Sequence, residues 1–318
     1  MPDWRPSATV HTLRERARIL REIRAFFFAR QVLEVETPAL ASSGNTDPNI
    51  HSYEVHDAVL DERQGWLHTS PEFFMKRLLA AGVGDCFQLA RVFRGGETGR
   101  LHNPEFTMLE WYRLGFSADD LMDEVDALVR AVLPRLDSAQ RLDYAEVFHA
   151  HVGLDPHAVG RDAMEDWLIN QGKLPRGMEG ANLADLLSVA FAERVEPALP
   201  AYCFVTAFPA CQASLARLIP GEPPRADRFE LYLNGVELAN GFRELTDADE
   251  QARRFQAERS RREQHGAPDI RPDMQMIAAL EHGLPDCAGV ALGLDRLLML
   301  ALEKTSVAEV MAFDAERA

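Results

Sequence analysis

The sequence predicts an α+β fold in which a β-sheet is flanked by helices within a single domain. Strand-like alternation of apolar and polar residues dominates both ends of the 318-residue chain, whereas its middle has helical periodicity. The dipeptide Asn234-Gly235 stands between two alternating runs, and tight hairpin turns favour such pairs because they need positive φ. The composition, 47% hydrophobic, is sufficient for one large core.

The N-terminal part begins with an amphipathic helix over about 11–30, where apolar residues recur at three- and four-residue steps. A short strand follows and stops at Pro38, which cannot donate to a β-ladder. The next predicted elements are strands at 66–70, 86–94 and 106–114, with a helix at 71–82 between the first two. Residues 118–200 have a mainly helical pattern.

The C-terminal part is again rich in strands. Alternating runs cover 202–208 and the hairpin 228–242. The highly charged helix expected over 247–265 is most simply a solvated surface helix. An apolar, glycine-punctuated strand at 287–294 then leads directly into a final helix.

Charge and composition restrict the classes of function. The net charge is −16 and only three residues are lysines, so no basic composition indicates nucleic-acid binding. No run of about 18 uncharged apolar residues is present, and the N-terminus is charged where a signal peptide is apolar. The four cysteines form no C-x-x-C motif. We therefore expect a cytoplasmic protein with reduced thiols, without a membrane partner and without tRNA.

Two arginines stand where strands end. Arg94 follows the strand 86–94, and Arg296 lies between the strand 287–294 and the final helix. A guanidinium group at a strand end is poorly placed for core packing but well placed to bind phosphate oxygens in a cleft. Either arginine alone could form a surface ion pair. Together they suggest a triphosphate that is held at both ends.

Acidic residues on the hairpin suggest a metal site. With a two-residue turn, Tyr232 faces Glu237, and Glu230 lies on the same face of the sheet. Two such carboxylates repel each other unless a cation lies between them, as nucleotide-bound Mg²⁺ would. The alternative is two exposed glutamates. Glu244 falls on the opposite face unless the strand bulges, and we expect that bulge at Asn240-Gly241.

A third group is Glu110 and Tyr112, alternate residues on one face of the strand 106–114. A carboxylate beside a phenol can receive an ammonium group. The alternative is an ordinary polar sheet face.

These residues resemble a known family. Phe93-Arg94-x-x-Glu97 resembles motif 2 of class II aminoacyl-tRNA synthetases, and the run from Gly289 to Arg296 resembles motif 3, which we place near 287–303. The helix and strand near 11–38 resemble motif 1, the dimer interface of that class. Motif 2 extends over about 86–112, and residues 118–200 would be a helical insertion. The resemblance implies an antiparallel sheet flanked by helices and a homodimer.

The match is more specific to one branch of the class. The runs Thr69–Glu72, His102–Tyr112 and Glu237–Glu244 are similar to the catalytic core of lysyl-tRNA synthetases. They are more similar still to the stand-alone paralogues that ligate (R)-β-lysine to elongation factor P. No anticodon-binding domain is expected before residue 11.

The resemblance implies a role for individual positions. Arg94 would hold the α-phosphate of ATP and Arg296 its γ-phosphate, and both would be catalytic; Phe106 would stack on adenine. The expected ATP-binding residues are Arg94, Gly95, Gly96, Glu97, His102, Asn103, Phe106, Glu237, Leu238, Gly293 and Arg296, with Glu230 and Glu237 as Mg²⁺ ligands. The expected substrate-binding residues are Ser70, Glu72, Glu110, Tyr112, Asn240, Phe242, Glu244 and Ala291.

Four positions differ from a lysyl-tRNA synthetase. Ser70 stands where alanine is usual and Ala291 where glycine is usual, which would reshape the pocket for an amine shifted by one carbon. The family commonly shows Asn-Glu at Gly95-Gly96, so an acidic contact from position 96 is missing. The implied reaction is ATP-dependent formation of an aminoacyl-adenylate from (R)-β-lysine or lysine, followed by transfer to a lysine of elongation factor P.

Three alternatives differ in their site chemistry. An asparagine-synthetase-like ligase would need a cation in the amino-acid pocket, where this chain has Glu110, Tyr112 and Glu244. A non-catalytic regulator would be expected to lack phosphate-binding arginines or metal-binding acids. A truncated lysyl-tRNA synthetase would need a domain that reads the anticodon.

Overall fold

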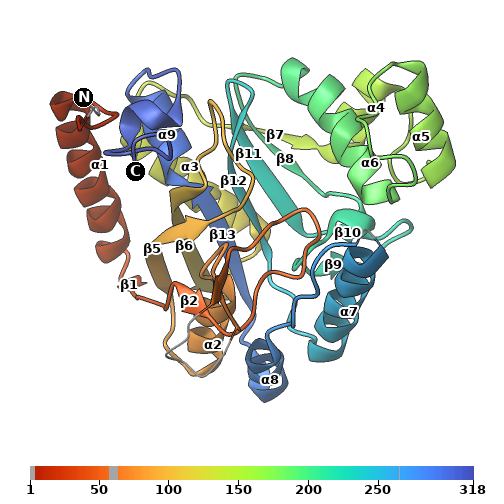
Figure 1. Cartoon of the computed structure of the whole chain (residues 1–318), viewed down its shortest axis with the longest axis horizontal. Coiled ribbons are helices and arrows are strands. Elements are labelled where there is room, and N and C mark those ends of the chain that lie inside the picture. The colour runs from red at the N-terminus through yellow and green to blue at the C-terminus, as the bar shows by residue number, and fades with distance from the viewer. Residues whose placement is uncertain (1–3, 57–63, 265) are drawn as a thin grey trace.

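The centre of the computed structural model, which describes residues 4–56, 64–264 and 266–318, is an eight-stranded sheet (Figure 1). Its inner strand pairs are antiparallel, and the two outermost pairs are parallel. The antiparallel, helix-flanked sheet expected from the sequence is thus confirmed except at its edges. In spatial order the strands are β1 (Leu33–Glu34), β5 (Cys86–Phe93), β6 (Glu105–Leu114), β13 (Cys287–Gly293), β12 (Val236–Arg243), β11 (Arg228–Leu233), β8 (Tyr202–Thr206) and β7 (Gln140–Asp143).

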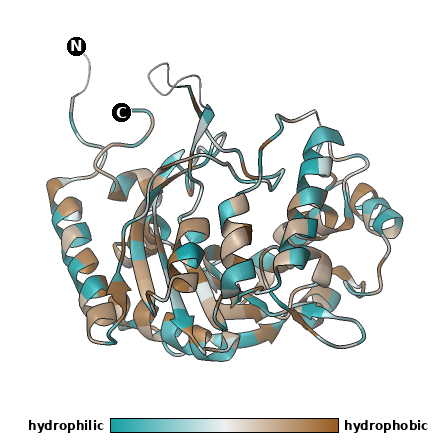
Figure 2. Cartoon of the chain, turned by 90° about the horizontal axis from the view of Figure 1, so that it is seen from below, coloured by the Kyte–Doolittle hydropathy of each residue, from teal (hydrophilic) through white to brown (hydrophobic). Residues whose placement is uncertain are grey.

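Helices cover both faces of this sheet. Successive side chains of a strand point to opposite faces, and Trp111 and Tyr112 of β6 accordingly belong to different apolar clusters. The face of Trp111 is covered by α1 (Val10–Phe28), α3 (Ala118–Val132) and α9 (Leu294–Ala301). The face of Tyr112 is covered by α2 (Glu72–Ala80), α7 (Ala248–Gln264) and α8 (Met274–Gly283). Apolar segments concentrate on the strands, and the outer helices carry much polar surface (Figure 2).

Helix α1 confirms the helix predicted over 11–30. Thr9 caps its N-terminus by accepting a hydrogen bond from the Thr12 backbone. Ile23 and Phe27 are fully buried, and the Phe27 ring stacks on Phe87 of β5 with centroids 4.5 Å apart. Helix α1 thus lies against the sheet, and the segment before it lies beside the C-terminal segment, where the Ser7 N–H donates to the Ala312 carbonyl at 2.8 Å (Figure 1).

The predicted hairpin is present, but its bulge lies elsewhere than expected. Asn234 and Gly235 both have positive φ, +52° and +72°, as a two-residue turn requires. Tyr232 pairs with Glu237, whereas Leu231 pairs with Ala239, so Leu238 is the extra residue. The expectation of a bulge at Asn240-Gly241 was wrong, because that segment pairs regularly with β13. The bulge at Leu238 nevertheless changes the parity of the strand as required.

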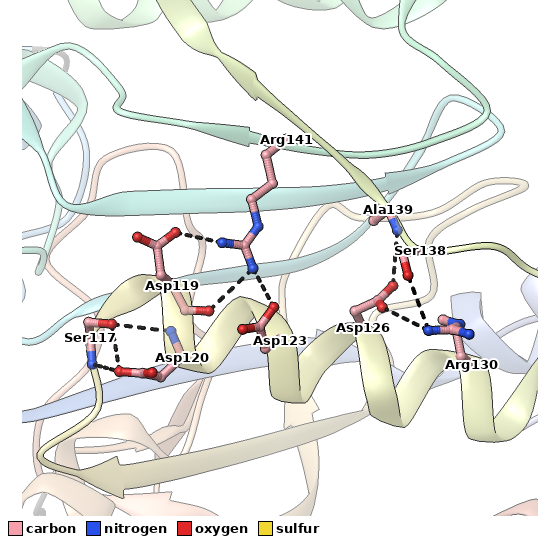
Figure 3. A network of polar contacts seen from close by, with 9 residues as sticks. All are labelled: Ser117, Asp119, Asp120, Asp123, Asp126, Arg130, Ser138, Ala139 and Arg141. Carbon is pink, nitrogen blue, oxygen red and sulfur yellow. Dashed lines mark hydrogen bonds and ion pairs between the residues drawn. The ribbon is translucent and has the colours of Figure 1, made fainter.

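Residues 118–200 are less uniformly helical than expected. Strand β7 interrupts them and pairs in parallel with β8 at the sheet edge. A polar network fixes β7 to α3 (Figure 3): Arg141 contacts Asp119 and Asp123 at 2.7 and 2.6 Å, and the Ala139 backbone donates to Asp126 at 3.1 Å. The sequence QRLD lacks the apolar alternation of a half-buried strand, which is why the prediction missed it. Helices α4 (Tyr144–Val152), α5 (Arg161–Asn170) and α6 (Leu183–Ala190) follow and share a second core with the sheet.

Several further short elements are present, and most of them were not predicted. A three-stranded sheet contains β2 (Leu40–Ala41), β4 (Gln64–Leu67) and β3 (Glu54–His56), and β9 (Leu218–Ile219) pairs with β10 (Arg225–Ala226). Of these strands, β4 overlaps the strand predicted at 66–70. Helix α8 was missed as well. Short 3₁₀ or π segments cover Phe191–Val195, Glu196–Ala198, Ala210–Gln212 and Val307–Val310. Across the three described ranges, no helix is both long enough and apolar enough to cross a membrane.

Candidate active site

A cavity of about 440 Å³ lies on the Tyr112 face of the sheet. Strands β6, β12 and β13 line it together with α2, the segment that joins β5 to β6, and residues of the loop before β3. Most of the predicted site residues line it: Ser70, Glu72, Arg94, Glu97, His102, Asn103, Phe106, Glu110, Tyr112, Glu237, Leu238, Asn240, Phe242, Glu244, Ala291, Gly293 and Arg296. Gly95, Gly96 and Glu230 lie outside the lining.

An ion pair ties the three motif-like segments together behind the cavity. Arg16 of α1 contacts Asp295 at the start of α9 at 2.5 Å and donates to Thr107 of β6 at 2.9 Å. The backbone N–H of Thr107 donates to the other Asp295 oxygen at 2.7 Å. Asp295 is 3% exposed, and a buried carboxylate needs such partners. The helix, the strand and Arg296 next in sequence are therefore fixed relative to one another.

Arg296 lies at one end of the cavity in a defined orientation. It donates to the backbone oxygens of Leu101 and Glu237 at 3.2 and 2.9 Å, and its Nη2 is 2.8 Å from Nε2 of His102. Burial and the charge of Arg296 both lower the pKa of His102, so its imidazole is neutral and can accept this hydrogen bond. The guanidinium also lies 3.7 Å from the Glu237 carboxylate, which leaves it loosely paired.

Arg94 follows β5 and is similarly loosely paired. Its closest acidic contact is Glu97 at 4.0 Å, and its guanidinium lies 5.3 Å from the centre of the Phe106 ring. The Nε atom of Arg94 is buried and has no hydrogen-bond partner among the described residues. A cation in this state can bind an incoming anion without first breaking a strong ion pair.

The loop after Arg94 is held by backbone contacts. The N–H of Gly95 donates to the His51 carbonyl at 2.7 Å, and Gly96 has a φ of +78°, which favours glycine. Asn103 donates to the Glu105 carbonyl at 2.6 Å and accepts from the Ala315 backbone at 2.9 Å. The Asn103 side chain therefore connects this loop to the C-terminal segment.

The two hairpin acids lie on one face, as predicted, but they do not have the same partners. Glu230 is bound by Arg228 and accepts from the Tyr232 hydroxyl at 2.6 Å. The Glu237 side chain is partly buried, and 42% of its surface is accessible to solvent. Burial, and then the charge of Glu230, raise the pKa of Glu237 to about 7. A divalent cation would relieve this repulsion, so the pair fits Mg²⁺ with phosphate oxygens completing its ligands. Among the residues that the structure describes, no cluster of three or more such ligands occurs.

The other end of the cavity is buried and acidic. Glu110 is 1% exposed, and its carboxylate accepts hydrogen bonds from the Ser70 hydroxyl at 2.5 Å and from the Tyr112 hydroxyl at 3.1 Å. Burial, and then the charge of Glu72, raise the pKa of Glu110 to about 8 despite these bonds. Burial raises the pKa of Glu244 to about 8 as well, although Lys76 opposes this shift. The predicted pairing of Glu110 with Tyr112 is therefore confirmed, and it belongs to a larger acidic group.

The sequence analysis missed Lys76, which lies in the middle of this group. The Nζ atom is 2.6 Å from Glu72 and 2.6 Å from Glu244, and the side chain is 1% exposed. It also lies 5.6 Å from the centre of the Phe242 ring. Two features of the sequence could have indicated it: lysine is rare in this chain, and Glu72 and Lys76 have the i, i+4 spacing of a helical ion pair.

Small residues of β13 make room for the acidic group. A Cβ on Gly289 would lie 2.3 Å from the Tyr112 ring and 2.4 Å from the Glu244 carboxylate, closer than atoms can approach. Ala291 stands between Glu110 and Asn240 in the strand register, and its methyl group faces the cavity. Strand β13 thus forms a floor with short side chains.

Helix α7 was expected to be a solvated surface helix, and this expectation was wrong. Phe255 is buried against Phe73 with ring centres 5.6 Å apart, and Glu258 lines the cavity while accepting from Thr46. The helix has only one narrow buried stripe, so its many charges concealed the packed face. Asn45, Asp47 and Asp273 are further lining residues that the sequence analysis did not identify.

Comparison with known proteins agrees with this geometry. The family model described as tRNA synthetases class II (D, K and N) matches residues 2–317. A protein of Pseudoalteromonas translucida (strain TAC 125) named elongation factor P–(R)-β-lysine ligase is 47% identical over 320 residues, which cover 99% of this chain and 98% of that protein. Proteins with the same name from Vibrio cholerae and Pectobacterium carotovorum are 46% and 47% identical, with 99% of this chain covered and 99% and 98% of the relatives.

The segments that resemble motifs 1, 2 and 3 are joined behind one cavity. The family model also matches nearly the whole chain. The chain belongs to the class II tRNA synthetase family of the aspartate, lysine and asparagine type.

Proposed function

We propose that this enzyme activates (R)-β-lysine, or lysine, with ATP and transfers the aminoacyl group to a lysine side chain of elongation factor P. The observation that carries the proposal is the division of one cavity into a cationic end, with Arg94 and Arg296, and a buried acidic end around Glu110 and Glu244. The cationic end suits a triphosphate, and the acidic end suits a substrate with ammonium groups. The names of the relatives supply the acceptor.

At the cationic end, Arg94 binds the α-phosphate and Arg296 the γ-phosphate of ATP. Phe106 stacks on adenine, and His102 and Asn103 line the nucleotide site with Gly95, Gly96, Glu97, Leu238 and Gly293. Glu230 and Glu237 would hold Mg²⁺, which neutralises phosphate charge when bound. Support comes from the loose ion pairs of both arginines and from the exposed carboxylate of Glu237.

At the acidic end, Glu244, Glu110 and Tyr112 receive the side-chain ammonium group, with Asn240 and Phe242 beside it. Ser70 and Glu72 recognise the other amino group and the carboxylate. Ser70 and Ala291 adjust the pocket to an amine shifted by one carbon, an effect of roughly 1–3 kcal/mol per methyl group. The pocket's acids disfavour an asparagine-synthetase-like ligase, since an acidic substrate would be repelled.

The reaction needs no protein nucleophile. An oxygen of the substrate carboxylate attacks the α-phosphorus, the bond to the β-phosphate breaks, and pyrophosphate leaves with its electron pair. Arg94 and Arg296 orient the phosphates and stabilise the negative charge that develops on them. The neutral amine of the acceptor lysine then attacks the acyl carbon of the adenylate. An amide bond forms, AMP leaves, and the amine loses its proton to solvent.

The cellular setting follows from the same proposal. A ligase of a translation factor works in the cytoplasm, and the motif 1 segment at α1 would form a homodimer interface as in other members of the class. The acceptor is then a protein, and no tRNA is expected.

The deciding experiment is the intact mass of purified elongation factor P after incubation with the enzyme, ATP, Mg²⁺ and (R)-β-lysine. The expected result is a gain equal to one lysyl residue, and reductively methylated elongation factor P is the control that should not change. Pyrophosphate exchange with (R)-β-lysine, lysine and aspartate tests activation separately. Absence of exchange with both lysines, or faster exchange with aspartate, would contradict the proposal, as would efficient charging of tRNA.

A further inference from the structure

Lys76 occupies a position that the proposed reaction does not use. Its ammonium group lies between Glu72 and Glu244 at 2.6 Å from one oxygen of each, so these two oxygens are at most twice that distance apart. Glu72 begins α2 and Glu244 directly follows β12. Lys76 therefore connects a helix to a strand end across the amino-acid pocket.

A buried lysine in this place has a large desolvation cost unless its partners are fixed. Burial alone lowers the pKa of Lys76, but Glu244 and Glu72 outweigh that effect and raise it, so the ammonium stays charged. Lys76 also lies over the Phe242 ring, which is a further contact for a cation. With a side chain 1% exposed, it is held by the pocket and does not act as a surface charge.

The charges of the pocket become complementary to a diamino acid when Lys76 is counted. Glu72, Glu110 and Glu244 supply three carboxylates, and Lys76 supplies one ammonium group. When all three carboxylates are ionised, two negative charges are left, the number that two substrate ammonium groups neutralise. Lys76 contacts one oxygen of Glu72 and one of Glu244, and the second oxygen of each remains for the substrate.

We infer that Lys76 is a positioning residue that sets the spacing between Glu72 and Glu244, and thereby the separation of the two amino groups that the pocket accepts. The inference rests on the proposed amino-acid site and extends it to selectivity for the separation of the two amino groups. The two nitrogens are joined through four carbons in (R)-β-lysine and in ornithine but through five in lysine, so carboxylates spaced for one of these separations leave one carboxylate unpaired with the other. An unpaired buried carboxylate is strongly unfavourable, so the spacing discriminates.

The test is the direct binding of (R)-β-lysine, lysine and ornithine to the full chain by calorimetry. For Lys76→Met we expect a 30- to 100-fold loss of affinity for the preferred lysine isomer, a ratio of affinities for the preferred and the other lysine isomer lowered about tenfold, and ATP affinity within about twofold of the parent. The pH below which amino-acid binding weakens should rise, because Glu244 loses its counterion while Glu72, Glu110, Tyr112 and Cys287 remain around it. Lys173→Met is the matched control, since Lys173 pairs with Glu193 at 2.6 Å on the protein surface.

A purely structural role would change thermal stability without changing the ratio of affinities for the two lysine isomers. Lys76→Arg keeps the charge and serves as the second variant if Lys76→Met does not fold. It should retain the pH dependence of the parent but lose selectivity, because the longer guanidinium side chain separates the two carboxylates differently. Unchanged selectivity in either folded variant would overturn the inference. If the parent protein binds lysine but does not catalyse pyrophosphate exchange, only the proposed reaction is contradicted. If the parent protein binds none of the amino acids, both the proposed reaction and the role of Lys76 are overturned.

Discussion

The two ends of the cavity differ in the sign of their charge, in their exposure and in how closely their charged groups are paired. At the cationic end, Arg94 and Arg296 are 26% and 22% exposed, and their acidic contacts among the described residues are 4.0 and 3.7 Å long. At the acidic end, Glu110 and Glu244 are almost fully buried, and Lys76 has two contacts of 2.6 Å. The binding free energy of a large, highly charged triphosphate can offset the ordering of the side chains that contact it. Selection among small amines, in contrast, needs pocket side chains that are already fixed before the substrate binds.

The difference predicts that substitutions at the two ends affect different steps. At the cationic end, Arg94→Ala should lower the rate of pyrophosphate exchange by about 10²–10³-fold, because a group that stabilises developing phosphate charge is lost. Amino-acid affinity, measured by calorimetry without ATP, should stay within about twofold. Arg135→Ala is a suitable control, since Arg135 pairs with Glu303 on the surface. An equal loss of amino-acid binding would mean that the two ends are not separate.

At the acidic end, Glu244→Gln should weaken amino-acid binding about 100-fold and leave ATP binding nearly unchanged. The substitution keeps the shape but removes the charge that pairs with Lys76 and with the substrate. Calorimetric titration with each ligand measures both effects. A comparable loss of ATP affinity would contradict the assignment of Glu244 to the amino-acid pocket.

The pH dependence should also distinguish the two ends. Burial raises the pKa of Glu110 and Glu244 to about 8 in the free protein. Below that pH these groups must lose a proton before an ammonium can pair with them, so amino-acid affinity should increase from pH 6 to 8, by up to about tenfold per unit for each proton released. At the cationic end, Glu237 is a single group with a pKa raised into this range, to about 7, so ATP affinity should change less than amino-acid affinity. Flat amino-acid binding over this range would show that the acids are already ionised.

The smallest effect is expected far from both ends. Arg141→Ala removes the contacts between β7 and α3 shown in Figure 3, and Asp119 and Asp123 are 76% and 78% exposed. Exposed ion pairs contribute at most about 1 kcal/mol, so thermal unfolding should change only slightly and exchange activity should be unaffected. Activity lost without loss of stability would connect this edge of the sheet to the cavity.

Much of the fold could be predicted because the relevant signals are local. The periodicity of α1 and the Asn234-Gly235 turn depend on neighbours a few residues away, and the structure confirms both. Strand β7 and the buried stripe of α7 were mispredicted, because their polar sequences are stabilised by distant partners such as Asp119 and Phe73.

The sequence by itself determined the family-like motifs, the residue types of the site and their alternation along β6 and β12. Only the tertiary structure decided where the parity of β12 changes, which residues face the cavity, and that Lys76 bridges Glu72 of its own helix and Glu244 after β12. The physical reason is that alternation and turn preference are properties of adjacent residues. The charge state of a buried pocket, in contrast, is set by groups that meet only after the chain has folded.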